Sequence, residues 1–189
     1  MRYYLFVEGF DDKHFFETLY SSSLPDAKCV EYSNMSHSKV NKFLQAIKGM
    51  DNVDYLFFCD EDKKGIEAKR ATVLNRYKNL ESEKLYVVQC EIESWYYAGI
   101  SELDCKKLRL NHFEYNTDQL CKEKFNSKLR KGSDRKYVMD QMLAVFNEDL
   151  ARNRNFTFSK FCQIKEKIGD LNWNNGCLYE GDNSKDNEV

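Results

Sequence analysis

The chain has 189 residues, of which 42% are hydrophobic, 32% charged and 14% aromatic. This length suits one domain with an appendage, and so many aromatic side chains exclude a largely disordered chain. No apolar run approaches the ~20 residues of a membrane span, and the early Glu8 is atypical of a secretion signal. The seven cysteines form no Cys-x-x-Cys pair, so we expect reduced thiols in a cytoplasmic protein.

The net charge of −2 hides an uneven distribution of charge along the chain. Residues 1–62 carry six basic against eleven acidic side chains, whereas residues 121–167 carry twelve basic against six acidic ones. Such a distribution suggests a cation for the first part and an acidic partner for the second. Lysines and arginines that merely solvate helices give the same pattern, so the charge alone decides little.

Four apolar runs of strand length occur in the first half, at residues 3–7, 28–32, 55–59 and 85–90. Their continuous apolar character is typical of strands that are buried on both faces. Segments with helical periodicity lie between them, at residues 11–20, 38–50 and 65–80. Strands that alternate with helices predict an α/β fold, with a mainly parallel four-stranded sheet flanked by helices.

After Cys90 the pattern changes, and no further strand is expected. We expect a helix at residues 92–99 and three more at 117–129, 135–150 and 157–168. The sequence therefore predicts an α/β domain at residues 1–100, a helical extension packed on it at 101–170, and a polar, flexible tail at 171–189.

Acidic residues follow three of the predicted strands. Glu8 ends the first, Asp60 and Asp62 follow the third, and Glu91 and Glu93 follow the fourth. Because ligands of open parallel sheets gather at the carboxyl ends of the strands, we expect these carboxylates to meet. A cluster of oxygen ligands repels itself unless protons or a cation compensate it, and it favours Mg²⁺ or Mn²⁺ over zinc.

A simpler interpretation is that these acids only cap the helices that follow them. Asp60 and Asp62 would then cap one helix, and Asp11 and Asp12 another. The two patterns Glu8-Gly9-x-x-Asp12 and Asp60-x-Asp62-x-x-Gly65 occur together and in this order, which favours the metal site. Asp12 is equally well explained as an N-cap and as a residue that orients the ligands.

Residues 3–12 and 60–65, with these two patterns, resemble the Toprim domain of bacterial primases, topoisomerases, recombination mediators, ribosomal RNA maturases and OLD-type nucleases. The resemblance covers roughly residues 1–100. It implies a Rossmann-like sheet in which Glu8 acts in acid–base chemistry, while Asp60 and Asp62 bind Mg²⁺. The segment from Glu91 to Trp95 also looks like the Glu-x-Trp segment of small stand-alone Toprim proteins found near phage-defence and mobile-element genes; Glu93 matches better than Glu91.

The resemblance implies metal-dependent cleavage of nucleic-acid phosphodiesters, with Glu8, Asp60 and Asp62 as catalytic residues. Glu8, Asp60, Asp62 and Glu93 would be the metal ligands, with Asp12 and Glu91 in secondary roles. It also leaves room for a homo-oligomer or a partner protein such as an ATPase. An acidic site needs basic residues to attract a polyanion, and we expect Lys131 and Lys136 to contact DNA or RNA.

Four further alternatives concern nearby residues and rival functions. We expect Trp95, Tyr96 and Tyr97 to pack in the core and not to stack on bases. We expect His14 to be a partly exposed residue of a helix and not part of the site. A receiver-type phosphoacceptor domain needs a lysine after a late strand, but here that strand ends in Gln89, Cys90 and Glu91. A non-catalytic nucleic-acid-binding or partner-binding module stays open as the alternative function.

Overall fold

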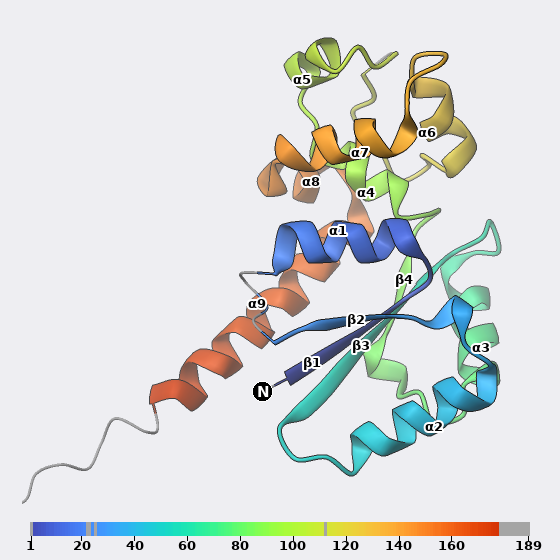
Figure 1. The fold of residues 1–189 in the computed structure, drawn as a ribbon, viewed down its shortest axis with the longest axis vertical. Coiled ribbons are helices and arrows are strands. Elements are labelled where there is room, and N and C mark those ends of the chain that lie inside the picture. Colours follow the sequence, from blue (N-terminus) through green and yellow to red (C-terminus); the bar gives the residue numbers. More distant parts are fainter. Residues whose placement is uncertain (1, 22–23, 25, 112, 178–189) are drawn as a thin grey trace, which may run out of the picture.

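The structure, a computed structural model, describes residues 2–21, 24, 26–111 and 113–177. Its centre is a four-stranded sheet of β1 (Arg2–Val7), β2 (Lys28–Glu31), β3 (Val53–Asp60) and β4 (Leu85–Val88), in the order β2-β1-β3-β4. All three pairings are parallel. The predicted α/β class and parallel sheet are therefore confirmed, and the arrangement is Rossmann-like (Figure 1).

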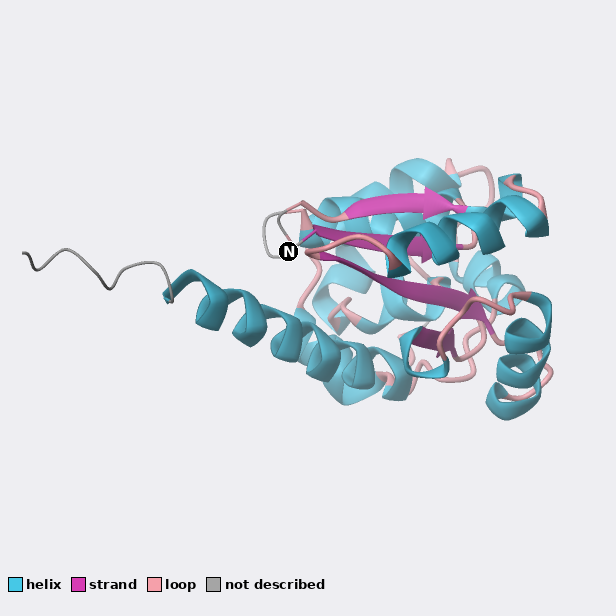
Figure 2. Cartoon of the chain, turned by 90° about the horizontal axis from the view of Figure 1, so that it is seen from below, coloured by secondary structure: helices cyan, strands magenta, loops and turns pink. Residues whose placement is uncertain are grey.

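Helices cover both faces of this sheet. The connections between strands contain α1 (Phe10–Tyr20), α2 (His37–Lys48) and α3 (Ile66–Arg76), together with short 3-10 turns at Tyr32–Asn34 and Ser82–Lys84. After β4 the described chain is helical, with α4 (Glu93–Ala98), α5 (Glu102–Lys107), α6 (Lys122–Lys128), α7 (Arg135–Ala144), α8 (Glu148–Arg154) and α9 (Phe156–Cys177). The far end of α9 extends away from the body (Figure 2).

Alternation along the strands divides the core into two clusters. Leu5, Leu56 and Phe58 face a cluster that includes side chains of α1, α4, α7 and α9. Phe6 and Phe57 face the opposite cluster, which α2 and α3 complete. Because successive side chains of a strand point to opposite faces, strands covered by helices on both sides have the continuous apolar sequences seen here.

The helical region departs from the predicted segments at several places. The single helix predicted at residues 135–150 is two helices, because Asn147 accepts a hydrogen bond from Leu150 N–H (2.8 Å) and so begins α8. The helix predicted at 117–129 starts only at Lys122, and α5 was not predicted. The last helix continues to Cys177, and the rest of the predicted tail lies outside the described residues.

In the part of the chain that the structure describes, no helix combines the length and the apolar character needed to cross a membrane.

Candidate metal and acid–base site

Glu8 lies at the carboxyl end of β1, between the ends of the two strands that flank it. Its Oε2 accepts a hydrogen bond from the backbone N–H of Asp60 at the end of β3 (3.1 Å). The same oxygen accepts one from the hydroxyl of Tyr32, which follows β2 (3.2 Å). Burial and the charge of Glu8 raise the pKa of Tyr32, so this hydroxyl stays protonated as a donor. The strand order thus brings together residues that are far apart in the sequence.

Asp60 carries the least compensated carboxylate of this edge. Its Oδ1 is buried and has no hydrogen-bond partner among the described residues. Burial raises its pKa well above the ordinary value, and the charges of Asp12, Glu8 and Glu93 raise it further. A buried carboxylate oxygen without a donor is costly unless a proton or a cation binds to it.

Asp12 is part of the same group of acids. It lies in the first turn of α1, is only 5% exposed, and its Oδ2 accepts a hydrogen bond from Gly9 N–H (3.2 Å). Burial raises its pKa to about 7; hydrogen bonding to Gly9 N–H opposes this shift, and the charges of Glu8 and Glu93 add to it. Asp12 is therefore not the N-cap, which is Gly9, but the third residue of the helix, whose carboxylate accepts from the N-cap backbone N–H; its role as a residue that orients the ligands stays a prediction. We refer to Glu8, Asp12, Asp60 and Glu93 as the carboxylate cluster.

Glu93 begins α4 and is 3% exposed. Burial raises its pKa, although the guanidinium of Arg135 opposes this effect. Arg135, at the start of α7, donates to Glu93 Oε1 (2.6 Å) and to Asp11 Oδ2 (2.8 Å). Lys122 Nζ lies 3.9 Å from Glu93 Oε1. The cluster therefore has a cationic rim that comes from the helical region.

Asp62 takes a different direction from Asp60. Asp62 and Lys63 both have positive φ angles (54° and 59°), which is uncommon for residues other than glycine. The turn that they form lets Asp62 pair with the ammonium of Lys69, a buried side chain of α3. Burial lowers the pKa of Lys69, but the hydrogen bond to Asp62 and the charge of Glu8 outweigh it and raise the pKa overall. A metal ion at Asp62 would have to share this carboxylate with Lys69, which contacts its Oδ2.

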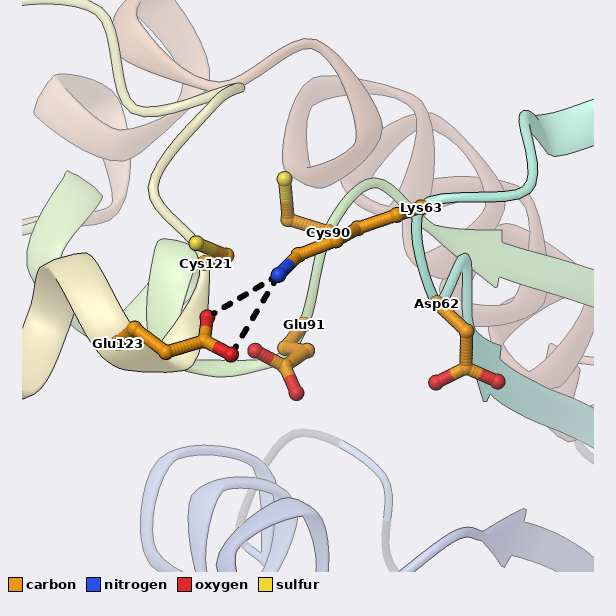
Figure 3. A pocket seen from close by; sticks show the side chains of 6 residues that line it. All are labelled: Asp62, Lys63, Cys90, Glu91, Cys121 and Glu123. Atoms are coloured by element: carbon orange, nitrogen blue, oxygen red, sulfur yellow. Dashed lines mark hydrogen bonds and ion pairs between the residues drawn. The ribbon is translucent and has the colours of Figure 1, made fainter.

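An acidic cavity of about 220 Å³ lies beside the cluster (Figure 3). Lys63 crosses it to reach both carboxylate oxygens of Glu123 (3.4 and 3.5 Å). In Figure 3 the carboxylates of Glu91 and Asp62 point to the same side of the cavity. Glu91 lines this cavity and accepts a hydrogen bond from Lys122 N–H, whereas Glu93 belongs to the cluster. The thiols of Cys90 and Cys121 complete the lining.

The remaining candidate residues lie outside the cluster. Trp95, Tyr96 and Tyr97 are fully buried, which confirms the core interpretation. Lys136 lies over the ring of Phe10 (5.2 Å to the centroid), and Lys131 lines a separate cavity. His14, which is partly exposed as expected, has its Nε2 at hydrogen-bond distance (2.6 Å) from Asp140 Oδ1.

Three further residues contact the site without any sequence pattern that marks them: Tyr32, Lys69 and Arg135. No sequence pattern marks a contact that spans 42 or 124 residues, as those of Arg135 do. The only available signal was the excess of basic residues in the helical region.

The carboxylate cluster has the oxygen donors that a hard divalent cation prefers. The donors are all carboxylate oxygens, one of them is buried without a hydrogen-bond partner in the described part of the chain, and three of the four acids have raised pKa values. As the side chains stand, however, no three His, Cys, Asp or Glu residues of the described chain form a ready-made ligand set. Binding an ion would therefore require side chains to rearrange.

No family model matches this chain, and neither a curated protein nor a solved structure matches it.

The raised pKa of Asp12 predicts a pH-dependent stability. Between about pH 4 and pH 7 the folded protein holds a proton on Asp12 that the unfolded chain has lost. The free energy of unfolding should therefore fall as pH rises through this window, by up to about 1.4 kcal/mol per pH unit for each such proton. Asp60 and Glu93 act with the same sign. Urea denaturation between pH 4 and 8, without divalent ions, measures this slope.

Asp12→Asn should flatten that slope, and Asp51→Asn, at an exposed position, should leave it unchanged. An identical pH dependence in the Asp12→Asn variant and the unmodified protein would contradict the assignment.

Arg135 is predicted to stabilise the fold through Glu93. Arg135→Gln should lower the free energy of unfolding by about 1–3 kcal/mol, because it leaves a buried carboxylate without its main partner. In a Glu93→Gln background the same change should cost less, since the buried charge is already gone. Lys106→Gln, which breaks the exposed pair with Glu102, should have no measurable effect. Equal costs of Arg135→Gln in both backgrounds would show that the ion pair is not the cause.

Proposed function

We propose that this chain is a Toprim-type nuclease that hydrolyses nucleic-acid phosphodiesters with the help of Mg²⁺ or Mn²⁺. The observation that carries the proposal is the direct contact of Glu8 with the end of β3, beside an Asp60 oxygen that is buried and unpartnered. It joins the two acidic patterns of the sequence at one edge of a parallel sheet, where ligands of such sheets bind.

In this proposal Asp60 is the main ligand, Asp12 and Glu93 lie beside it as further carboxylates, and Asp62 would share its carboxylate between the ion and Lys69. The bound ion would polarise the phosphoryl oxygens and stabilise the charge of the transition state. Deprotonated Asp60 would then be compensated by the ion instead of by a proton. Asp12, through Gly9 N–H, would fix the turn between β1 and α1 on which Glu8 lies.

Glu8 is the proposed acid–base residue. Both of its hydrogen bonds go to Oε2, so Oε1 is the oxygen that would accept a proton from water or return one to the leaving group. The bonds from Tyr32 and Asp60 hold the carboxylate in one orientation, which general acid–base catalysis requires. Arg135 and Lys122, at the rim, would contribute positive charge where a phosphate approaches.

A second candidate function is a non-catalytic binding module. It is favoured by the ion pairs that already engage Asp62 with Lys69, and Glu93 with Arg135. Such pairs compensate part of the acidic charge without a metal. The phage-defence or mobile-element context suggested by the resemblance fits either function.

The cleavage experiment separates the two functions. Labelled single-stranded and duplex DNA and RNA are incubated with the protein and Mn²⁺ or Mg²⁺. Glu8→Gln and Asp60→Asn should each lower the cleavage rate by about 100-fold or more. Asp51→Asn, purified in the same way, should cleave at the unmodified rate and exposes any contaminating nuclease. If the protein binds nucleic acid but none of the substrates is cut with either ion, the binding module is the correct function.

Metal binding itself is predicted to involve Asp60. Mn²⁺ at 100 times its dissociation constant should stabilise the fold by about 2.7 kcal/mol, which raises Tm by about 5–10 °C. Asp60→Asn should abolish this shift. Because Asp12 and Asp60 hold protons more strongly than usual, binding near pH 6 should release protons, seen as a dependence of the calorimetric heat on the buffer. An equal Tm shift in Asp60→Asn would place the ion elsewhere.

A further inference from the structure

A second cavity, of about 420 Å³, lies on the helical region between the segment after α5 and the start of α7. Its lining includes three exposed cations, the exposed ring of Tyr137 and the polar residues Ser133 and Asp134; the cations are Arg109, Arg130 and Lys131. We call it the basic cavity. Its volume lies within the usual range of small-ligand sites.

The cations of the basic cavity differ from three other basic residues of the helical region. Lys122, Lys128 and Arg135 are all paired with carboxylates. Arg109, Arg130 and Lys131 take part in none of the ion pairs formed by the described residues. Three unpaired cations around one cavity produce a positive potential that an anionic ligand would satisfy.

The acid of the basic cavity does not neutralise these cations through an ion pair. Asp134 is the N-cap of α7, and its Oδ1 accepts hydrogen bonds from the backbone N–H groups of Lys136 (2.9 Å) and Tyr137 (3.3 Å). Its charge is therefore directed to the helix terminus. The cavity keeps a net positive lining.

Tyr137 adds an aromatic surface to this positive lining. Its side chain is 62% exposed, although burying a tyrosine ring would ordinarily stabilise a fold. An exposed ring next to unpaired cations is the combination with which proteins bind single-stranded nucleic acid, where bases stack on rings and phosphates contact cations. In a duplex the faces of the bases are already stacked, so the ring would have no partner.

The start of α7 links the basic cavity to the carboxylate cluster. Arg135 contacts Glu93 of the cluster, and Tyr137 lines the cavity. Since successive helical residues are rotated by about 100°, exposed Lys136 lies about 100° around the helix axis from each of these two. A strand that passes around this end of α7 would meet Arg135, then Lys136, then the cavity.

We infer that the basic cavity is a nucleotide subsite for single-stranded nucleic acid, with phosphates on the three cations and a base stacked on Tyr137. This inference rests on the proposed function, because it takes the ligand to be the polymer on which the carboxylate cluster would act. The inferred substrate class is single-stranded nucleic acid, and the experiment decides whether its sugar is ribose or deoxyribose.

Binding is measured by fluorescence anisotropy of labelled 20-nucleotide DNA and RNA, single-stranded and duplex, with EDTA so that no cleavage occurs. We expect single strands to bind at least tenfold more tightly than duplexes. Changing Arg109, Arg130 and Lys131 together to Ser should weaken single-strand binding more than tenfold and reduce the slope of log K against log salt by about 2. The DNA and RNA arms show which sugar is preferred.

The matched control changes three exposed cations elsewhere, Lys39, Lys42 and Lys78, to Ser. It lowers the net charge equally and should change binding less than twofold. Tyr137→Ala should weaken binding about five- to tenfold, and Tyr137→Trp should retain it, because stacking needs only a ring. Circular dichroism verifies that each variant is folded.

Several results would overturn the inference: equal binding of duplexes, equal effects of the two triple variants, no difference between Tyr137→Ala and Tyr137→Trp, or no binding at all. The outcome is separate from that of the cleavage experiment. Binding that depends on the cavity, without cleavage, supports the subsite and refutes the nuclease. Cleavage, with binding that does not depend on the cavity, supports the nuclease and refutes the subsite.

Discussion

The hydrogen bond from Asp60 N–H to Glu8 Oε2 is the contact on which the site depends. It exists because β1 and β3 are parallel neighbours, so that their carboxyl ends lie at one edge of the sheet. The same contact brings a second acid next to Glu8, in a place where burial already disfavours charge. Holding acids at one edge of a buried sheet therefore has an electrostatic cost. Protons on the acids and basic side chains of the surrounding helices offset this cost.

The fold and the position of Glu8 could be predicted because they follow from local patterns. Continuous apolar runs alternating with amphipathic segments leave few arrangements besides a parallel sheet covered on both faces. In such a sheet Glu8 and Asp60 must lie at the same edge whatever the details of packing. The burial of Trp95, Tyr96 and Tyr97 followed in the same way, from a short helix that comes directly after a buried strand.

What could not be predicted depends on backbone turns and on contacts between distant segments. The spacing Asp60-x-Asp62 suggests two carboxylates on one ion, but positive φ angles at Asp62 and Lys63 direct Asp62 to Lys69. The role of Arg135 required α7 to pack against both α1 and α4, which no local pattern encodes. The break between α7 and α8 likewise depends on a cap at Asn147 within an otherwise continuous helical pattern.

The distribution of compensating charge is the reason to place an ion at the centre of the cluster. Arg135 compensates Glu93 and Asp11 on one side, and Lys69 compensates Asp62 on the other. Asp12 and Asp60 have no ion pair among the described residues, and burial together with the charges of neighbouring acids raises their pKa values. A proton compensates one carboxylate at a time, whereas a divalent cation compensates two and also satisfies the unpartnered oxygen of Asp60. The centre is thus the position where a divalent ion would gain most, and the proposed chemistry needs it there.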